Sequence, residues 1–249
     1  AVLFEKTDGA SVSNLTIEGT TLTQNTQKGA LSNDIRHSVV TDIRVKDLTI
    51  NNDTNQTGGL AGTIADSEIR RISMENISIR SNNTMGGIAG QFDGKIMEDC
   101  VVSGSIEGTS VHPMGVRAGG ITGWQGGGTI RRVVTKVNIT APASVGNGGI
   151  IGGPQSGSAA VESAVSLSTG VNANRISGWD VLGITSSAYE LETSDSQSSM
   201  NEANTDRIFT VTQEQVKEKA FYTETLGWSE DVCNFDSIAA DGIPALKKL

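Results

Sequence analysis

Aromatic residues, histidine and cysteine are all scarce in this chain of 249 residues. Phe, Tyr and Trp together make up 4% of the sequence, which contains two histidines and two cysteines. His37 and His112 are far apart and belong to no HExxH motif of the kind found in zinc peptidases. Neither histidine has neighbours that indicate a Ser-His-Asp or Cys-His arrangement. The sequence therefore predicts no catalytic, metal-binding or cofactor-binding residue in this chain.

Long apolar runs and an excess of positive charge are also missing. No stretch of about 18 apolar residues occurs, so we expect no membrane insertion. The formal net charge of −9 disfavours nucleic acid and anionic membranes as partners. The chain passes from Ala1–Phe4 directly into its first repeat with no signal peptide, so we expect a segment of a longer protein.

The two cysteines do not fix the cellular compartment, since sparse cysteine suits the cytosol and also the surface proteins of Gram-positive bacteria. Cys100 occupies a position that is apolar in other repeats, so it is expected to be a buried small hydrophobic residue. A disulfide between Cys100 and Cys233 is the less favoured alternative.

The most informative feature of the sequence is a repeat. An apolar residue, two polar residues and another apolar residue recur six times, at intervals of 28 to 33 residues. Such a period indicates stacked supersecondary units, none of which can bury its apolar face alone. The six apolar pairs are Val12 and Leu15, Val40 and Ile43, Ile69 and Ile72, Met97 and Cys100, Ile130 and Val133, and Val161 and Ala164.

A glycine-rich phrase runs in phase with these pairs. A doubled glycine at a fixed place in each repeat is typical of a tight corner, where another backbone approaches closely. Four copies are clear, at Gly58–Gly62, Gly86–Gly90, Gly119–Gly123 and Gly148–Gly152. Weaker copies precede and follow them, at Gly29–Leu31 and Leu182–Thr185.

The apolar spacing within one repeat predicts short strands separated by bends. Ile72 and Met74 alternate, as do Ile77 and Ile79, which is the periodicity of a strand. The three-residue step from Ile69 to Ile72 keeps both side chains inward only if the chain bends between them. We therefore predict an all-β fold, a right-handed parallel β-helix of about six coils. A sandwich of short hairpins is the alternative.

The repeat predicts three parts of the chain. Residues 1–185 are expected to form the β-helix, residues 186–206 a polar loop, and residues 207–249 a C-terminal cap. Thr212–Gln215 has the form of a capping box, which predicts a short helix over residues 216–221 that Gly227 would end. A helix followed by an aromatic-rich tail would cover the last apolar coil.

The polar residues between the repeated apolar pairs carry alternating charge. Stacked coils would place Arg70 and Arg71, then Glu98 and Asp99, then Arg131 and Arg132 one above another. We favour an exposed ladder of ion pairs that fixes the register of the coils, each pair contributing about 0–1 kcal/mol. The alternative is an anion-binding or glycan-binding site at that corner.

Two tryptophans, Trp124 and Trp179, fall at predicted turns and are candidate protein-binding residues. Packing of these rings over neighbouring glycines is the simpler interpretation. Parallel β-helices also include polysaccharide lyases and glycosidases, which need paired carboxylates or a basic residue at the scissile bond. The foremost acidic pair, Glu98 and Asp99, is already explained by the ladder, so an enzyme that acts on polysaccharide is the remote alternative.

Several segments resemble a known family. Residues 86–96, continuing through Cys100 to residues 104–108, closely resemble the GLUG repeat of bacterial surface proteins. The opening, residues 3–4 and 9–17, is similar to the first coil of the repeat region in streptococcal immunoglobulin A1 protease-type zinc metalloproteases. The ending, residues 221–228 and 242–246, is similar to the module that closes that region. Cys233 departs from the family, which tends to have a larger apolar residue there.

This resemblance implies a non-catalytic region of a large exported protein attached to the cell surface or cell wall of a Gram-positive bacterium. The family's zinc site uses an HExxH motif and a distant Glu, and no such positions exist here, so the parent's zinc would lie outside this segment. The expected partners are a host-protein substrate of immunoglobulin type and the parent's protease domain, with the region itself monomeric. An adhesin or stalk domain is the alternative.

Overall fold

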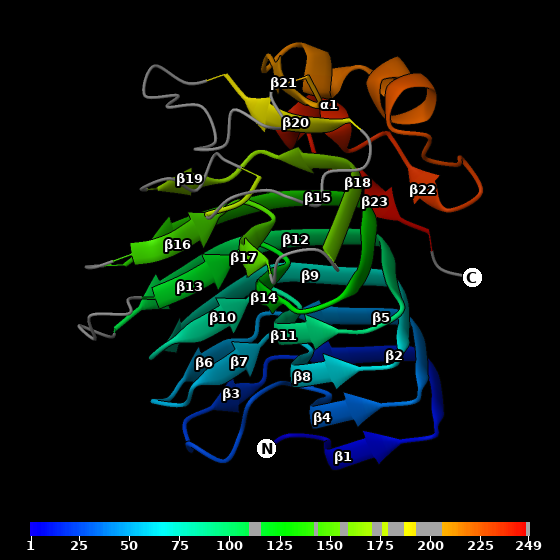
Figure 1. Cartoon of the computed structure of the whole chain (residues 1–249). Helices are drawn as coiled ribbons and strands as arrows, with labels where there is room; N and C mark the ends of the chain where they lie inside the picture. Colours follow the sequence, from blue (N-terminus) through cyan, green and yellow to red (C-terminus); the bar gives the residue numbers. More distant parts are fainter. Residues whose placement is uncertain are drawn as a thin grey trace.

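The computed structural model describes residues 1–109, 116–141, 144–154, 159–170, 176–178, 187–192 and 206–247. Its strands stack into a parallel β-solenoid of about five full turns, which rises from the N-terminus (Figure 1). Each coil contributes strands to the same sheets, so strands adjacent in space come from successive coils. The predicted parallel β-helix is confirmed.

Three sheets form the walls of the solenoid. The six-stranded sheet contains β1 (Phe4–Asp8), β4 (Ser32–Arg36), β8 (Ala61–Ala65), β11 (Ala89–Asp93), β14 (Thr122–Gln125) and β17 (Ile151–Pro154). The main strands of the eleven-stranded sheet are β2 (Ser11–Glu18), β5 (Val39–Lys46), β9 (Glu68–Ser81), β12 (Ile96–Gly108), β15 (Gly128–Thr140), β18 (Ala159–Ser166), β20 (Ala188–Leu191) and β21 (Ile208–Val211). Its short strands are β3 (Thr21–Leu22), β6 (Thr49–Asn51) and β19 (Thr169–Gly170). The four-stranded sheet contains β7 (Gln56–Gly58), β10 (Thr84–Gly86), β13 (Val116–Gly119) and β16 (Ser144–Gly148).

The pairings within these three sheets are parallel throughout the described strands. A sandwich of hairpins would require antiparallel pairing. The sandwich alternative is therefore wrong.

The repeated apolar pairs stack in register. Val12 lies beside Val40, which in turn lies beside Ile69. The same column continues through β12, β15 and β18 as Met97, Ile130 and Val161. Val40, Ile69, Met97, Ile130 and Val161 are 0–1% exposed and belong to the interior cluster. The core of the solenoid is thus filled by equivalent apolar residues of successive coils, stacked on one another.

A residue in the left-handed conformation makes the bend inside each pair. The second polar residue of all six repeats has φ between 47° and 59°. This conformation turns the chain so that the apolar residues on both sides face inward. Asn and Asp adopt it readily and Arg rarely. These residues, which we call the corner column, are Asn14, Asp42, Arg71, Asp99, Arg132 and Ser163.

The glycine pairs make the corner between the four-stranded and six-stranded sheets. Gly58, Gly86, Gly119 and Gly148 are register partners in successive coils. A Cβ atom added at Gly59 would collide with the carbonyl oxygen of Gly87 in the next coil. These glycines have ordinary φ values. Close stacking of backbones, and not left-handed geometry, requires glycine here.

The boundaries predicted beyond residue 185 need correction. Residues 188–191 were predicted to lie in a polar loop, but they form β20, which pairs with β18 in parallel. β21 then pairs with β20, so the eleven-stranded sheet continues into the predicted cap. The strand forms because Ala188 and Leu191 are buried in two different apolar clusters. The predicted repeat copy at 182–185 and most of the predicted loop, residues 193–205, lie outside the described residues.

Residues 212–247, which we call the C-terminal module, begin at a confirmed capping box. The Thr212 N–H donates to Gln215 Oε1 at 2.9 Å, and the Gln215 N–H donates to Thr212 Oγ1 at 3.2 Å. The predicted single helix is divided into a 3₁₀-helix, η2 (Gln215–Lys217), and a π-helical turn, η3 (Phe221–Thr225). Gly227 follows with φ 69°, where the helix was predicted to end. The antiparallel pair β22 (Cys233–Asn234) and β23 (Ala245–Leu246) and the short helix α1 (Ile238–Asp241) complete the module.

The C-terminal module covers the flank of the solenoid as well as its end. A second apolar cluster joins Tyr222, Trp228 and Leu246 of the module to Val101 and Val134 on the outer face of the eleven-stranded sheet. Figure 1 shows the module above the last coils, and β23 lies lower on the flank, against β9. The predicted cap therefore exists, and it reaches further down the outside of the rod than an end cap would.

Candidate functional site

The predicted charge ladder lies on the outer side of the corner between two strand segments. Glu98 is the register partner of Arg70 below it and of Arg131 above it. Arg71, Asp99 and Arg132 follow directly in the corner column. The six predicted ladder residues are therefore brought together as stacking of the coils required.

Glu98 is the centre of the ladder. Its carboxylate pairs with Arg70, with Arg131 Nε at 2.6 Å and with Arg132 Nη2 at 2.6 Å. The residue is only 2% exposed. The prediction of an exposed ladder is wrong at this rung, because the guanidinium groups of the neighbouring coils cover the carboxylate. A carboxylate so enclosed needs these partners, since burial of an unpaired charge is strongly unfavourable.

The corner column continues the network. Arg132 binds both oxygens of Asp99, at 2.6 and 3.1 Å, and Arg71 binds both oxygens of Asp42, at 2.6 and 2.5 Å. The Arg71 hydrogen bonds lower the pKa of the Asp42 carboxyl, and the Asp42 and Asp99 carboxylates raise the pKa of Arg71 and Arg132. Such two-point contacts fix the geometry of both side chains.

Each arginine of the ladder has a carboxylate partner. Arg70 pairs with Glu68 at 3.0 Å as well as with Glu98, and the other three bind Glu98, Asp99 or Asp42. An anion or a glycan would have to displace these internal partners before it could bind. The arrangement favours the register-fixing interpretation over the alternative of an anion site.

Trp124 lies on β14, partly buried. The Arg117 guanidinium carbon is 4.8 Å from the centre of its ring, a cation–π distance. Its register partners are Gln91 below and Gly153 above. The ring thus stacks with Arg117 beside a glycine position of the next coil, which agrees with the packing interpretation. Burial lowers the pKa of Arg117. Trp179, the other candidate, lies outside the described residues.

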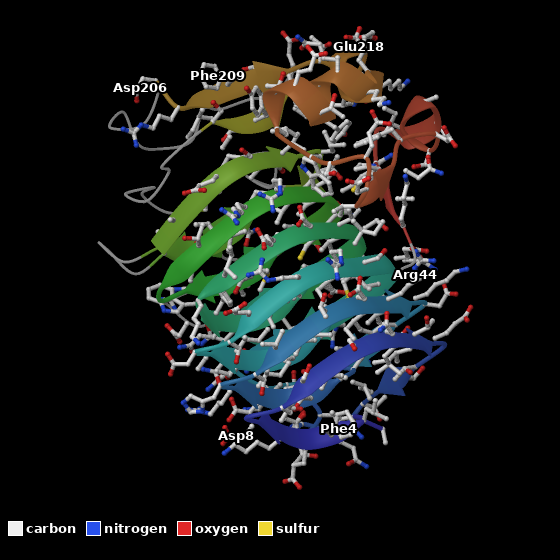
Figure 2. All side chains as sticks on the ribbon, turned by 90° about the vertical axis from the view of Figure 1, so that its right-hand side faces the viewer. Phe4, Asp8, Arg44, Asp206, Phe209 and Glu218 are labelled. Atoms are coloured by element: carbon white, nitrogen blue, oxygen red, sulfur yellow. The ribbon has the colours of Figure 1, made fainter. Side chains whose placement is uncertain are left out.

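Sequence reasoning missed a groove beside the end of the C-terminal module. It has a volume of about 230 Å³ and lies between the corner column, near Asp42 and Arg71, and the outer face, near Arg44 and Ser73. Leu246 and Lys247 of the module also line it. Arg44 Nη2 donates to the Leu246 carbonyl oxygen at 3.1 Å. Figure 2 shows Arg44 directly beneath the descending tail.

A signal for this contact exists in the sequence. One outward residue per coil is stacked in register along the eleven-stranded sheet, and we call these residues the outer column. Its composition changes from polar to apolar at the fourth coil, which marks where another part of the chain must pack. The outer column consists of Thr16, Arg44, Ser73, Val101, Val134, Val165, Tyr189 and Phe209.

Both cysteines are buried free thiols, so the disulfide alternative is wrong. Burial raises the pKa of the Cys100 thiol, and it raises the pKa of Cys233 to about 12. His37 is exposed and its Nδ1 lies 2.9 Å from Asp8 Oδ1, while His112 lies outside the described residues. The described residues contain no group of three or more His, Cys, Asp or Glu side chains able to hold a metal ion.

In the part of the chain that the structure describes, no helix is both long enough and apolar enough to cross a membrane. No family model matches the chain, and neither the curated proteins nor the solved structures include a match to it.

Proposed function

We propose that this chain is a non-catalytic β-helix region of an exported bacterial zinc metalloprotease. In this proposal it acts as a scaffold that positions or helps to recognise a host-protein substrate of immunoglobulin type. The HExxH motif and the zinc ion belong to a protease domain elsewhere in the parent protein, at the surface of a Gram-positive bacterium. The proposal rests on the sequence resemblance together with the shape of the solenoid.

The observation that carries the proposal is the stacking of six corners in one register, with an ion-pair network on their outer side that is centred on the buried Glu98. Glu98 joins three coils through Arg70, Arg131 and Arg132. A solenoid held in this way offers a long, rigid flank that can bind a partner without a deep pocket. A scaffold that must hold a large substrate at a fixed distance from a protease domain needs such rigidity.

Two experiments test the proposal. First, the coding sequence that flanks this region should encode an HExxH motif, and a parent protein without one contradicts the proposal. Second, the region is deleted from the parent protein and kcat/KM is measured on the native substrate and on a short peptide that spans the cleavage site. We expect a loss on the native substrate and little change on the peptide, because only the native substrate reaches the scaffold. An unchanged kcat/KM on the native substrate rules out a recognition role.

A stalk or adhesin is the second candidate, and the internal pairing of the ladder favours it. Because each ladder arginine already has a carboxylate partner, that face offers few unsatisfied groups to a ligand. A stalk predicts that replacing this region with an unrelated rigid domain of equal length leaves the parent's function intact. A recognition module predicts that the same replacement abolishes the function. Product release from polyuronides by the isolated region would instead support a polysaccharide-active enzyme.

A further inference from the structure

The groove below the C-terminal module differs from the rest of the molecule in its charge. Arg44, Arg71 and Lys247 line it, whereas Asp42 is the acidic residue among its lining residues. The whole chain has a net charge of −9, so a cation-rich concavity stands out. Such a local excess attracts anionic groups more strongly than a flat surface does.

The cations of the groove are not all neutralised. Asp42 already binds Arg71 through both of its oxygens. Arg44 Nε lies 3.6 Å from Glu75 Oε1, an oxygen that also accepts a hydrogen bond from Ser73 Oγ at 2.9 Å. Among the described residues, no carboxylate lies within ion-pair distance of Lys247. Arg44 therefore has one long ion pair, which is weaker than the two-point pairs of the ladder, and Lys247 has none within the described part of the chain, so both side chains can still take an anionic partner.

The groove is also partly preorganised. Arg44 donates to the Leu246 carbonyl oxygen, which holds its guanidinium beside the tail of the module. The Lys247 N–H donates to the Val232 carbonyl oxygen at 2.8 Å, which fixes the backbone that carries the lysine. A site held in place before binding loses less entropy when the ligand arrives.

We propose that this groove binds a carboxylate group presented by a polypeptide, either an acidic side chain or a C-terminus. The volume of about 230 Å³ suits one side chain. Pockets for whole small molecules are commonly about 300–1,000 Å³. Arg44 and Lys247 supply charge-assisted hydrogen bonds, and Leu246 supplies an apolar contact. The inference does not depend on a protease parent, because it concerns only residues of this chain.

The test uses the full chain labelled with ¹⁵N, and three acetylated tripeptides as probes. The first is an amide with glutamate between two glycines, the second has glutamine in place of glutamate, and the third is triglycine with a free C-terminal carboxylate. Backbone amide shifts of Thr16, Arg44 and Ser73 report binding. We expect the glutamate peptide to shift these amides with a Kd in the range of about 1–10 mM. The glutamine peptide should leave them unchanged, and the triglycine acid shows whether a chain terminus also binds.

Three variants locate the contact. Lys247→Gln and Arg44→Gln should each weaken binding by roughly three- to tenfold, the usual net effect of losing one hydrogen bond at a site that water reaches. Lys46→Gln is the matched control, because Lys46 is exposed on β5, the strand that carries Arg44, and does not line the groove. Lys247→Gln keeps the backbone hydrogen bond to Val232, so it separates loss of charge from loss of the fold.

The proposal fails if the glutamine peptide shifts the same amides equally, or if Lys247→Gln binds as tightly as the unaltered chain. It also fails if neither acidic peptide moves the groove amides at 50 mM, which is at least five times the expected Kd. Stronger shifts with a trigalacturonate than with the glutamate peptide would assign the groove to sugar acids and overturn the choice of a polypeptide. Weaker binding at higher ionic strength is expected in the supporting case.

Discussion

The lower and upper halves of the outer column have the same strand arrangement and differ in what packs on them. Thr16, Arg44 and Ser73 of the first three coils are polar, and the groove lies beside them. Val101 and Val134 of the next coils are apolar, and the C-terminal module covers them. The repeat itself is the same in both halves, with inward residues aligned from coil to coil. The apolar cluster of the module therefore packs on the coils whose residue in this column is apolar, and the module reaches the polar coils through its tail at Leu246 and Lys247.

The largest expected effect comes from placing a charged residue in the apolar upper half of the outer column. Val134 is fully buried under the module, so Val134→Asp places a carboxylate among apolar side chains. We expect a loss of about 3–5 kcal/mol in the free energy of unfolding, measured by urea denaturation. Thr16→Asp, at the exposed residue of the same column in the first coil, should change stability by less than about 0.5 kcal/mol. Equal effects of the two substitutions would contradict the comparison.

A smaller loss is expected at the ladder. Glu98→Gln removes the charge that Arg70, Arg131 and Arg132 share. These arginines are 23–38% exposed and can be partly solvated, so we expect a loss of about 2 kcal/mol, below that for a fully enclosed pair. Glu107→Gln breaks the exposed pair with Arg80 and is the control, with an expected change below about 0.5 kcal/mol.

Glu98→Arg, which places like charges side by side, should destabilise the fold more than Glu98→Gln does. An unchanged melting temperature for Glu98→Arg at low salt would refute the register described here.

The reactivity of the two cysteines compares the local stability of the C-terminal module, which contains Cys233, with that of the solenoid, which contains Cys100. The buried Cys233 has its pKa raised to about 12, and the pKa of the Cys100 thiol is raised as well, so neither forms much thiolate at pH 8 in the folded state. We expect the C-terminal module, whose apolar cluster is smaller than that of the solenoid interior, to open locally before the solenoid unfolds. We therefore expect Cys233 to react with iodoacetamide at least about tenfold faster than Cys100 in low urea. Peptide mass spectrometry of quenched samples measures both rates, and equal rates would show that the two regions unfold as one unit.

The smallest effect concerns acid pH in the lower half. The pKa of Asp42 is lowered in the folded state by Arg71, so this carboxyl stabilises the fold above its unfolded pKa of about 3.9. The stabilisation is lost as the pH falls through the folded pKa. Between pH 5 and pH 3, the unaltered chain should lose up to about 1 kcal/mol more than Asp42→Asn. Urea denaturation at pH 5 and pH 3 measures the loss of stability for the unaltered chain and for Asp42→Asn. Equal losses for the two proteins would mean that the Asp42–Arg71 pair does not contribute to stability.

The interior and the corners of the solenoid were predictable from the sequence because their residues repeat from coil to coil. Val40, Ile69 and Met97 recur at a fixed interval, and the three-residue steps require a bend at the place where Asp42, Arg71 and Asp99 adopt positive φ. The charges of the ladder could also be aligned, since their register follows from that of the apolar pairs. Periodicity is sufficient wherever a residue contacts its own equivalent in the next coil.

The packing on the outer surface of the solenoid was not predictable from the repeat. The burial of Glu98 depends on how neighbouring arginine side chains fold over it, and no sequence period encodes that. The groove at Arg44 depends on where Leu246 returns to the flank, a contact between residues 202 positions apart. β20 is too short, and its surroundings too polar, for alternation to reveal it.

The alternation of charge in the corner column has a consequence for how such a rod changes length. Asp42, Arg71, Asp99 and Arg132 follow one another in successive coils. Excision of the coil that carries Arg71 would bring Asp42 against Asp99, carboxylate against carboxylate. Excision of two consecutive coils would bring Asp42 against Arg132 and restore attraction. The column thus imposes a parity rule, under which this part of the solenoid grows or shrinks by even numbers of turns.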